Sequence, residues 1–386
     1  MPLPAPTLGS VVPEPLRRLF RRVFPHQPPD HPALWRRACQ KMVLGGVEPA
    51  GEHLVVHGWL VAPDDVRPHV EFALQDGHTG TAYPVTRCDY PLPRPDVAAR
   101  LGRHVPAAGT SGFMIWSPRP DPSAPPGDLK ISATDRRTGA PLGADYLPLF
   151  HPSADRLGPV PVGQHIRRVI GEQSVFSFAH GGYTAFRRME AVVRDATGRP
   201  LSAYPRVLDW GCGCGRVSRY FLPLPGISVT GADVDPETVA WCRTNLPAGR
   251  WEVLPLRPPT ALPDAGFDLA FGVSVFTHLK EPEQHAWLAE LRRVIRPGGL
   301  ALMTFHGDAS VVWAGLSAER YTVLMRDGIC DQPNPLYDAD LGEADYYRDT
   351  FHTAGYVRRV WGEYFDVLDI RPSHIAHQDL AVLRRR

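Results

Sequence analysis

Three alternating glycines near the middle of the chain have a spacing suited to binding a ligand. Gly211, Gly213 and Gly215 stand between a segment typical of a strand, 206–209, and a segment typical of a helix, 216–222. Glycine adopts backbone angles that other residues resist, and it lets the backbone approach a ligand closely. The helix N-terminus adds free N–H groups and the positive end of a dipole. We therefore expect residues 211–215, called the glycine turn below, to bind a ligand.

An acidic residue follows the next predicted strand. Residues 228–232 are typical of a strand and lead to Asp233, which lies 20 residues after Gly213. A carboxylate at this place in a βαβ unit can accept hydrogen bonds from both hydroxyls of a ribose. The glycine spacing is G-x-G-x-G and differs from the G-x-G-x-x-G of dinucleotide sites. The pattern favours a ribose-containing ligand other than a dinucleotide.

Four segments of the chain resemble motifs of the class I S-adenosylmethionine (SAM) methyltransferases. They are 207–216, 231–236, 267–278 and 291–299, and they occur in the order that the family has. The resemblance covers residues 160–386. It implies an α/β fold with a Rossmann-like sheet of seven strands, and SAM as the cofactor.

The resemblance also implies roles for residues around the glycine turn. The turn, with Cys212 inside it, would pass beside the amino-acid and ribose parts of SAM. Asp209 would contact the turn or the cofactor's amino group, Asp233 the ribose hydroxyls, and Val234 the adenine. The alternative role for Asp233 is a helix N-cap, which Asp235 fits better because Pro236 follows it.

Polar residues after the fourth and fifth predicted strands are candidates for ligand contacts. Ser274, a candidate cofactor contact, and His278 follow strand four, at the carboxyl edge where such sheets bind ligands. His278 can act as a base for a hydroxyl acceptor, since its ordinary pKa lies near neutrality. The alternative is a histidine that caps a helix or packs. His306, after strand five, is a second candidate.

The segment upstream of strand one, 176–183, holds aromatic residues and glycines that family members often use to close over SAM. Phe178, Tyr183 and His180 are therefore candidate cofactor or acceptor contacts, and a buried aromatic at a helix start is the alternative. Arg167 and Arg168 are candidates to pair with the SAM carboxylate.

Composition excludes some partners. The chain is 43% hydrophobic and 22% charged, with a formal net charge of +1, so a nucleic-acid partner has no electrostatic support. Cys212 and Cys214 lack further ligands at metal-site spacing, so no metal is expected. Free thiols fit a reduced, cytoplasmic setting. We expect neither a signal peptide nor a membrane span, because no suitable apolar run occurs.

The chain divides into four predicted parts. Residues 1–39 are rich in Pro and Arg, 40–150 are typical of an all-β sandwich, 151–163 form a linker, and 164–386 form the α/β domain. Within the first part, residues 15–24 place apolar side chains on one helix face and arginines on the other. This helix would contact an anionic membrane surface weakly, or dock on its own protein.

We expect in-line methyl transfer to a small molecule or glycan, with O-methylation favoured by His278 and the β-sandwich. One alternative is a SAM-consuming enzyme that releases methylthioadenosine by intramolecular displacement, because the cofactor site alone does not fix the chemistry. Another is a glycan- or partner-binding protein that uses the methyltransferase fold as a scaffold. The sequence leaves the acceptor and the oligomeric state open.

Overall fold

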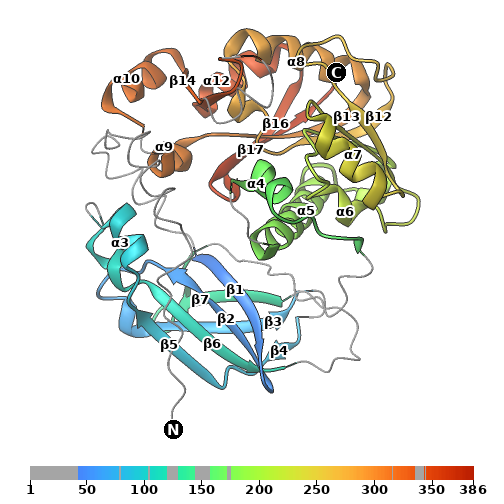
Figure 1. The fold of residues 1–386 in the computed structure, drawn as a ribbon. Coiled ribbons are helices and arrows are strands. Elements are labelled where there is room, and N and C mark those ends of the chain that lie inside the picture. Colours follow the sequence, from blue (N-terminus) through green and yellow to red (C-terminus); the bar gives the residue numbers. More distant parts are fainter. Residues whose placement is uncertain are drawn as a thin grey trace.

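The structure is a computed structural model of the full chain. It describes residues 42–77, 80–102, 105–119, 129–143, 157–171, 175–314, 316–334, 343 and 345–386. The predicted amphipathic helix over 15–24 and all of 144–156, which includes the first part of the predicted linker 151–163, lie outside the described residues. Figure 1 shows two parts, a β-rich part formed by the N-terminal third of the chain and an α/β part formed by the remainder.

The N-terminal part contains two four-stranded sheets that share one apolar core. Leu54, Val56 and Ile115 of one sheet pack with Phe72 and Ile131 of the other. The alternation of buried and exposed residues along these strands places one face of each sheet inward, as a sandwich requires. The strands are β1 (Met42–Ala50), β2 (His53–Leu60), β3 (Val70–Asp76), β4 (Ala82–Tyr83), β5 (Arg87–Leu92), β6 (Gly112–Pro118), β7 (Leu129–Asp135) and β8 (Ala140–Pro141).

The sheet orders are β1-β2-β6-β5 and β4-β3-β7-β8, and all neighbouring pairs are antiparallel. The sequence did not predict β1, β5 or β8, nor the helix α3 (Pro95–Leu101). Two glycines, Gly45 and Gly46, lie within β1. In the structure the ring of His57 on β2 lies against both glycines, where an added Cβ would stand 2.9 and 2.4 Å from it.

The α/β part is built on the seven-stranded sheet that the family resemblance implies. Its order is β11-β10-β9-β12-β13-β17-β16, with β17 antiparallel to both of its neighbours and the other pairs parallel. The strands are β9 (Arg206–Trp210), β10 (Ser228–Asp233), β11 (Arg250–Val253), β12 (Phe267–Gly272), β13 (Ile295–Phe305), β16 (Asp366–Ile375) and β17 (Gln378–Arg384).

Helices cover both faces of this sheet (Figure 1). One face packs against α5 and α6, and the other packs against α8 and α12. The order of strands brings the ends of β9, β10, β12 and β13 to one edge, where parallel sheets bind ligands. The helices of this part are α4 (Gln164–Ile170), α5 (Val175–Thr197), α6 (Ser218–Phe221), α7 (Pro236–Asn245), α8 (Glu281–Val294), α9 (Asp308–Ala314), α10 (Ala318–Asp327) and α12 (Ala354–Val360).

Between β13 and β16 the chain forms an insertion that the sequence predicted poorly. The sequence of 346–362 predicts a helix, which the structure confirms for Ala354–Val360 and contradicts for Arg348–His352. The structure has a strand, β15 (Arg348–His352), before α12, and it pairs antiparallel with β14 (Ile329–Pro333). The strand forms because it has a partner about 20 residues upstream, and helical spacing within one segment cannot reveal such a partner.

The two parts of the chain share an apolar cluster, called the interdomain cluster below. Trp59 of β2 and Leu101 of α3 pack with Val311 and Val312 of α9. The Trp59 ring lies 5.8 Å from the ring of Trp313. Since α9 follows β13 directly, the β-sandwich rests on the insertion that leaves the carboxyl edge of the large sheet.

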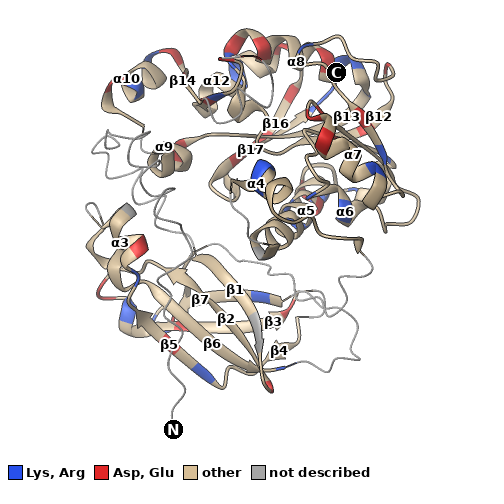
Figure 2. Cartoon of the chain, viewed as in Figure 1, with Lys and Arg blue, Asp and Glu red and all other residues tan. Residues whose placement is uncertain are grey.

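Charged residues of both signs are interspersed along the described elements of both parts (Figure 2). This distribution accompanies the formal net charge of +1. Among the described helices, none combines the length and the hydropathy needed to cross a bilayer.

Candidate cofactor and acceptor site

All three glycines of the glycine turn have positive φ angles. The values are 75° for Gly211, 49° for Gly213 and 66° for Gly215, a region that residues with a Cβ rarely adopt. Added Cβ atoms at Gly211 and Gly213 would stand 2.3 Å from Val275 Cγ2 and 2.7 Å from Val169 Cγ2. The turn is therefore held between α4 and the segment after β12, with no room for side chains.

Asp233 is joined to the glycine turn by a direct hydrogen bond. The Gly213 N–H donates to Oδ2 of Asp233 over 2.7 Å, and the Asp235 N–H donates to Oδ1 over 2.9 Å. A backbone hydrogen bond from Val234 also reaches this carboxylate, which with about four acceptor sites keeps capacity for a further donor. Asp235, in contrast, caps α7 by accepting from the Glu237 N–H. The structure thus gives the N-cap to Asp235 and leaves Asp233 at the turn.

Asp209 is buried at the end of β9, and its carboxylate accepts a hydrogen bond of 2.6 Å from the Ser218 hydroxyl. Burial raises the pKa of Asp209 to about 7; the hydrogen bond from Ser218 opposes this rise, and the nearby Asp233 adds to it. The charge of Arg216 stabilises the ionised form. Arg216 is a basic residue at the turn that sequence reasoning missed, although it directly follows the last glycine.

The raised pKa of Asp209 predicts a specific pH dependence of stability. Its folded pKa of about 7 exceeds the ordinary value of about 3.9, so its contribution is complete below pH ~4 and is lost as the pH rises through ~7. The free energy of unfolding of the natural protein is expected to fall between pH 4.5 and pH 8 because Asp209 ionises. In Asp209→Asn, whose side chain stays neutral, this fall is expected to be smaller by on the order of 2–4 kcal/mol. Urea unfolding at both pH values measures this, and parallel losses would contradict it.

The helix α5 approaches the glycine turn through two of its own glycines. A Cβ added at Gly182 would stand 2.1 Å from the backbone oxygen of Arg216, whereas one at Gly181 would stand 3.1 Å from the mobile end of the Arg216 side chain. The backbone cannot yield as a side chain can. Gly182 therefore sets the distance between α5 and the turn.

Gly182→Ala is expected to lower the free energy of unfolding by about 1–3 kcal/mol, because α5 must move away from the turn. Gly181→Ala is the matched control. It is expected to change stability by less than about 1 kcal/mol, since alanine favours the helix and the guanidinium can shift. Chemical denaturation of the two variants tests this, and equal losses would remove the proposed role of Gly182.

Several predicted cofactor contacts lie in apolar cores instead. Phe178 has no exposed surface and packs with Ile166 and Cys214. Tyr183 lies inside α5, 5.2 Å from the ring of Tyr220. Cys212 is buried in the cluster beneath α7. These side chains support the glycine turn from behind, and their types alone do not distinguish a supporting from a contacting aromatic.

Three further residues that the sequence singled out, Arg168, His180 and Val234, also have contacts or burial within the fold. Arg168, a candidate for the SAM carboxylate, instead pairs with Asp235 at 3.2 Å and with Glu237 at the start of α7. His180 is buried within α5, and burial lowers its pKa to about 3. Val234 packs partly buried against the core beneath α8. Arg216 thus replaces Arg168 as the cation beside the turn.

His278 lies at the acceptor edge with one ring nitrogen engaged. Its Nδ1 is 2.9 Å from the Arg348 carbonyl oxygen; because a carbonyl only accepts, Nδ1 carries the proton and Nε2 keeps its lone pair. Its ring stacks on Tyr347 at 4.1 Å. Burial lowers the pKa of His278, and the charge of Asp349 opposes this. A neutral imidazole with a free lone pair can accept a proton.

Ser274 has a φ of 62°, in the left-handed region. Its N–H donates to the Thr304 hydroxyl over 2.8 Å, and its own hydroxyl accepts from Gln378 Nε2 over 2.6 Å. The ring of His306, after β13, lies 6.2 Å from that of His278. The structure therefore brings together the predicted Ser274, His278 and His306, and adds Gln378, which the sequence analysis did not single out.

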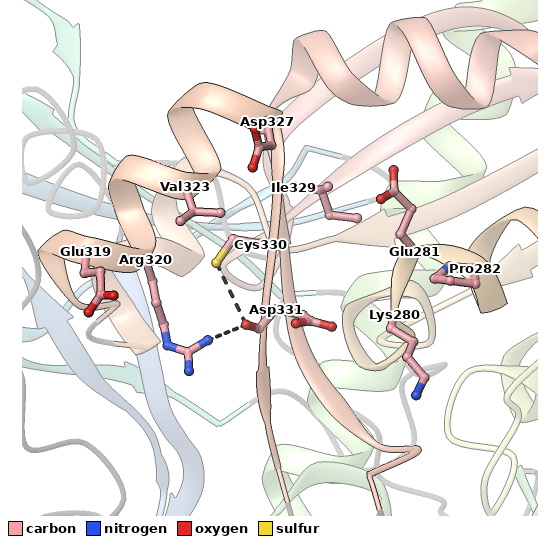
Figure 3. Close-up of a pocket in the computed structure, with 10 residues that line it drawn as sticks. All are labelled: Lys280, Glu281, Pro282, Glu319, Arg320, Val323, Asp327, Ile329, Cys330 and Asp331. Carbon is pink, nitrogen blue, oxygen red and sulfur yellow. Dashed lines mark hydrogen bonds between the residues drawn. The ribbon is translucent and has the colours of Figure 1, made fainter.

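Two cavities lie away from the glycine turn. One, of about 670 Å³, is bounded by α10, β14 and the start of α8 (Figure 3). Lys280 on its wall is two residues beyond His278, and Arg320 donates to the Asp331 carbonyl across it. The other, of about 740 Å³, lies at the amino end of β9 and β10. Among the described residues, no cluster of His, Cys, Asp and Glu could hold a metal ion.

Comparison with known proteins identifies the fold of the site. A methyltransferase-domain family matches residues 207–299. A 2-methyl-6-phytyl-1,4-hydroquinone methyltransferase of Synechocystis sp. is 32% identical over 25% of this chain and 30% of its own length. A malonyl-[acyl-carrier protein] O-methyltransferase of Serratia marcescens is 33% identical over 38% of this chain and 59% of its own.

A probable S-adenosylmethionine-dependent methyltransferase of Mycolicibacterium smegmatis is 33% identical over 35% of this chain and 49% of its own length. The chain thus spans less than two thirds of each of these curated relatives. The matched region holds the glycine turn, Asp233, Ser274 and His278.

The residues at the turn fit SAM. Asp233 keeps free lone pairs beside a turn that has no side chains, and Asp209 and Arg216 supply opposite charges for an amino-acid group. The cofactor expected from the sequence is the cofactor of this family. Residues 207–299 of this chain therefore match a methyltransferase-domain family, and their glycine turn and Asp233 have the geometry expected of an S-adenosylmethionine site.

Proposed function

We propose that the chain transfers the methyl group of SAM to a hydroxyl of a small-molecule or glycan acceptor. The observation that carries this proposal is His278 after β12, whose Nδ1 is engaged by the Arg348 carbonyl, so that the lone pair of a neutral ring lies on Nε2. The segment that bears it contacts the glycine turn through Val275. The relative in Serratia marcescens is named as an O-methyltransferase, which agrees with an oxygen atom as the acceptor.

In this proposal the residues of the chain bind and orient, and one of them takes a proton. Asp233 accepts from the ribose hydroxyls, while Asp209 and Arg216 hold the amino-acid end of the cofactor. SAM, when bound, supplies a methyl group activated by its sulfonium. Alignment of acceptor and methyl at about 3–3.5 Å provides most of the acceleration. His278 accepts the hydroxyl proton as the oxygen attacks.

The proposal is tested by isothermal titration of the full chain with SAM and with S-adenosylhomocysteine. Mass spectrometry of SAM incubated with the protein is run in parallel. Micromolar binding with SAM left intact would support a transferase that awaits its acceptor. Conversion to methylthioadenosine would replace methyl transfer with intramolecular displacement, and absence of binding to either ligand would overturn the cofactor site.

A further inference from the structure

Several buried polar atoms lack a hydrogen-bond partner among the described residues, and two of them at the acceptor edge are Oε1 of Gln378 and Nδ1 of His306. The two side chains belong to residues that are only 7% and 9% exposed. A buried polar atom without a partner costs roughly 1–3 kcal/mol. Such atoms in a native protein need an explanation, and a ligand that supplies the partner is one.

Gln378 is fixed in place by its other amide atom. Its Nε2 donates to the Ser274 hydroxyl, and the Ser274 N–H donates to the Thr304 hydroxyl. These bonds join the start of β17 to the ends of β12 and β13. Ser274 is held in a left-handed conformation that costs about 1 kcal/mol or more. Oε1 of Gln378 is thus a rigidly placed acceptor.

His306 is fixed from the opposite side. Its carbonyl accepts from the His352 N–H over 2.8 Å. Its ring lies 5.2 Å from that of Phe351 and 5.9 Å from that of His377. The backbone of Thr350 engages the ring by a hydrogen bond, while burial lowers the pKa of His306 well below its ordinary value. The ring is therefore neutral, and Nδ1 can accept a hydrogen bond.

Both acceptor atoms lie at the same edge of the sheet as His278. β17 runs antiparallel to β13, with Asp379 opposite Phe305, so the start of one strand adjoins the end of the other. Gln284 shows the contrasting arrangement. Its amide nitrogen donates to the Leu279 and Phe276 carbonyls, and its amide oxygen meets His352. That glutamine is fully used within the fold, whereas Gln378 is not.

We propose that Gln378 and His306 bind the acceptor by accepting hydrogen bonds from two of its hydroxyl groups. The acceptor class is then a neutral molecule with two neighbouring hydroxyls, as in a sugar or a catechol. The hydroxyl at Gln378 keeps its proton, whereas the hydroxyl at His306 has only one proton and gives it to His278, whose ring is 6.2 Å from that of His306, when it is methylated. Its hydrogen bond to His306 therefore positions the acceptor before the transfer and is exchanged for one to His278 during it. This assignment rests on the proposed function, because it places the acceptor opposite the cofactor.

The test measures binding of two diol probes, catechol and methyl β-D-glucopyranoside, to the full chain saturated with S-adenosylhomocysteine. At least one probe is expected to bind. Gln378→Leu and His306→Phe are expected to weaken its binding about 10-fold each, the loss of one hydrogen bond. Gln378→Glu, which keeps an accepting oxygen, should bind within about 3-fold of the natural chain.

Three controls keep the outcomes distinct. All variants should bind S-adenosylhomocysteine as the natural chain does, and circular dichroism should show an unchanged fold. 1,2-Dimethoxybenzene, which has no donors, should not bind. If both variants bind the diol as the natural chain does, or if neither diol binds, the acceptor site is overturned. If S-adenosylhomocysteine itself fails to bind, the proposed function fails first.

Discussion

Replacing Asp233 with alanine is expected to weaken SAM binding about 100-fold or more. Hydrogen bonds to a charged carboxylate contribute roughly 1.5–3 kcal/mol each, and the proposed site uses one for each ribose hydroxyl. The substitution also removes the acceptor for the Gly213 N–H, which holds the glycine turn at 2.7 Å from the carboxylate. Isothermal titration of both proteins measures the loss.

Asp235→Ala is the matched control, since it removes a carboxylate two residues away. Asp235 caps α7 and pairs with Arg168, so its loss is expected to lower stability by about 1 kcal/mol. SAM affinity should stay within about 3-fold, because Asp235 serves the helix and not the ribose. Equal affinity of Asp233→Ala and the natural chain for SAM would remove Asp233 from the site.

Trp59→Ala is expected to lower the free energy of unfolding by about 3–5 kcal/mol. Trp59 is 5% exposed and lies in the interdomain cluster against Trp313. Its removal opens a cavity between the β-sandwich and α9. We also expect the two parts of the natural chain to unfold in one transition, because they share this cluster. Urea denaturation followed by circular dichroism measures both.

Trp116→Ala, in the same sandwich, is the comparison. Trp116 is half-buried, and the Arg87 guanidinium lies 4.3 Å above its ring. Exposed cation–π contacts of this kind contribute about 0.5–1 kcal/mol. A loss for Trp59→Ala no larger than that for Trp116→Ala would show that the interdomain cluster adds little stability.

The cofactor side of the site could be predicted because it is encoded locally. Gly211, Gly213 and Gly215 must occupy positive φ, a demand that few other residue types meet. Asp233 is fixed at the end of the neighbouring strand by the regular geometry of a βαβ unit. In such cases spacing along the chain translates directly into proximity in space.

The acceptor side could be predicted only in part, because distant segments build it. His278 and His306 follow two predicted strands. Gln378 reaches Ser274 from 104 positions along the chain, so nothing near Gln378 in sequence marks it. The same reason explains why β1 and β15 were not predicted from the sequence. The glycines of β1 gain a packing partner only when His57 covers them, and β15 pairs with β14. Pairing between distant segments lacks a local signal.

The interdomain cluster imposes a delay during synthesis of the protein. Trp59 and Leu101 leave the ribosome early, whereas their partners Val311 and Val312 lie about 200 residues later. At about 5–20 residues per second, this gap corresponds to about 10–40 s. For that time the nascent β-sandwich presents uncovered aromatic and aliphatic surface, a natural substrate for chaperones.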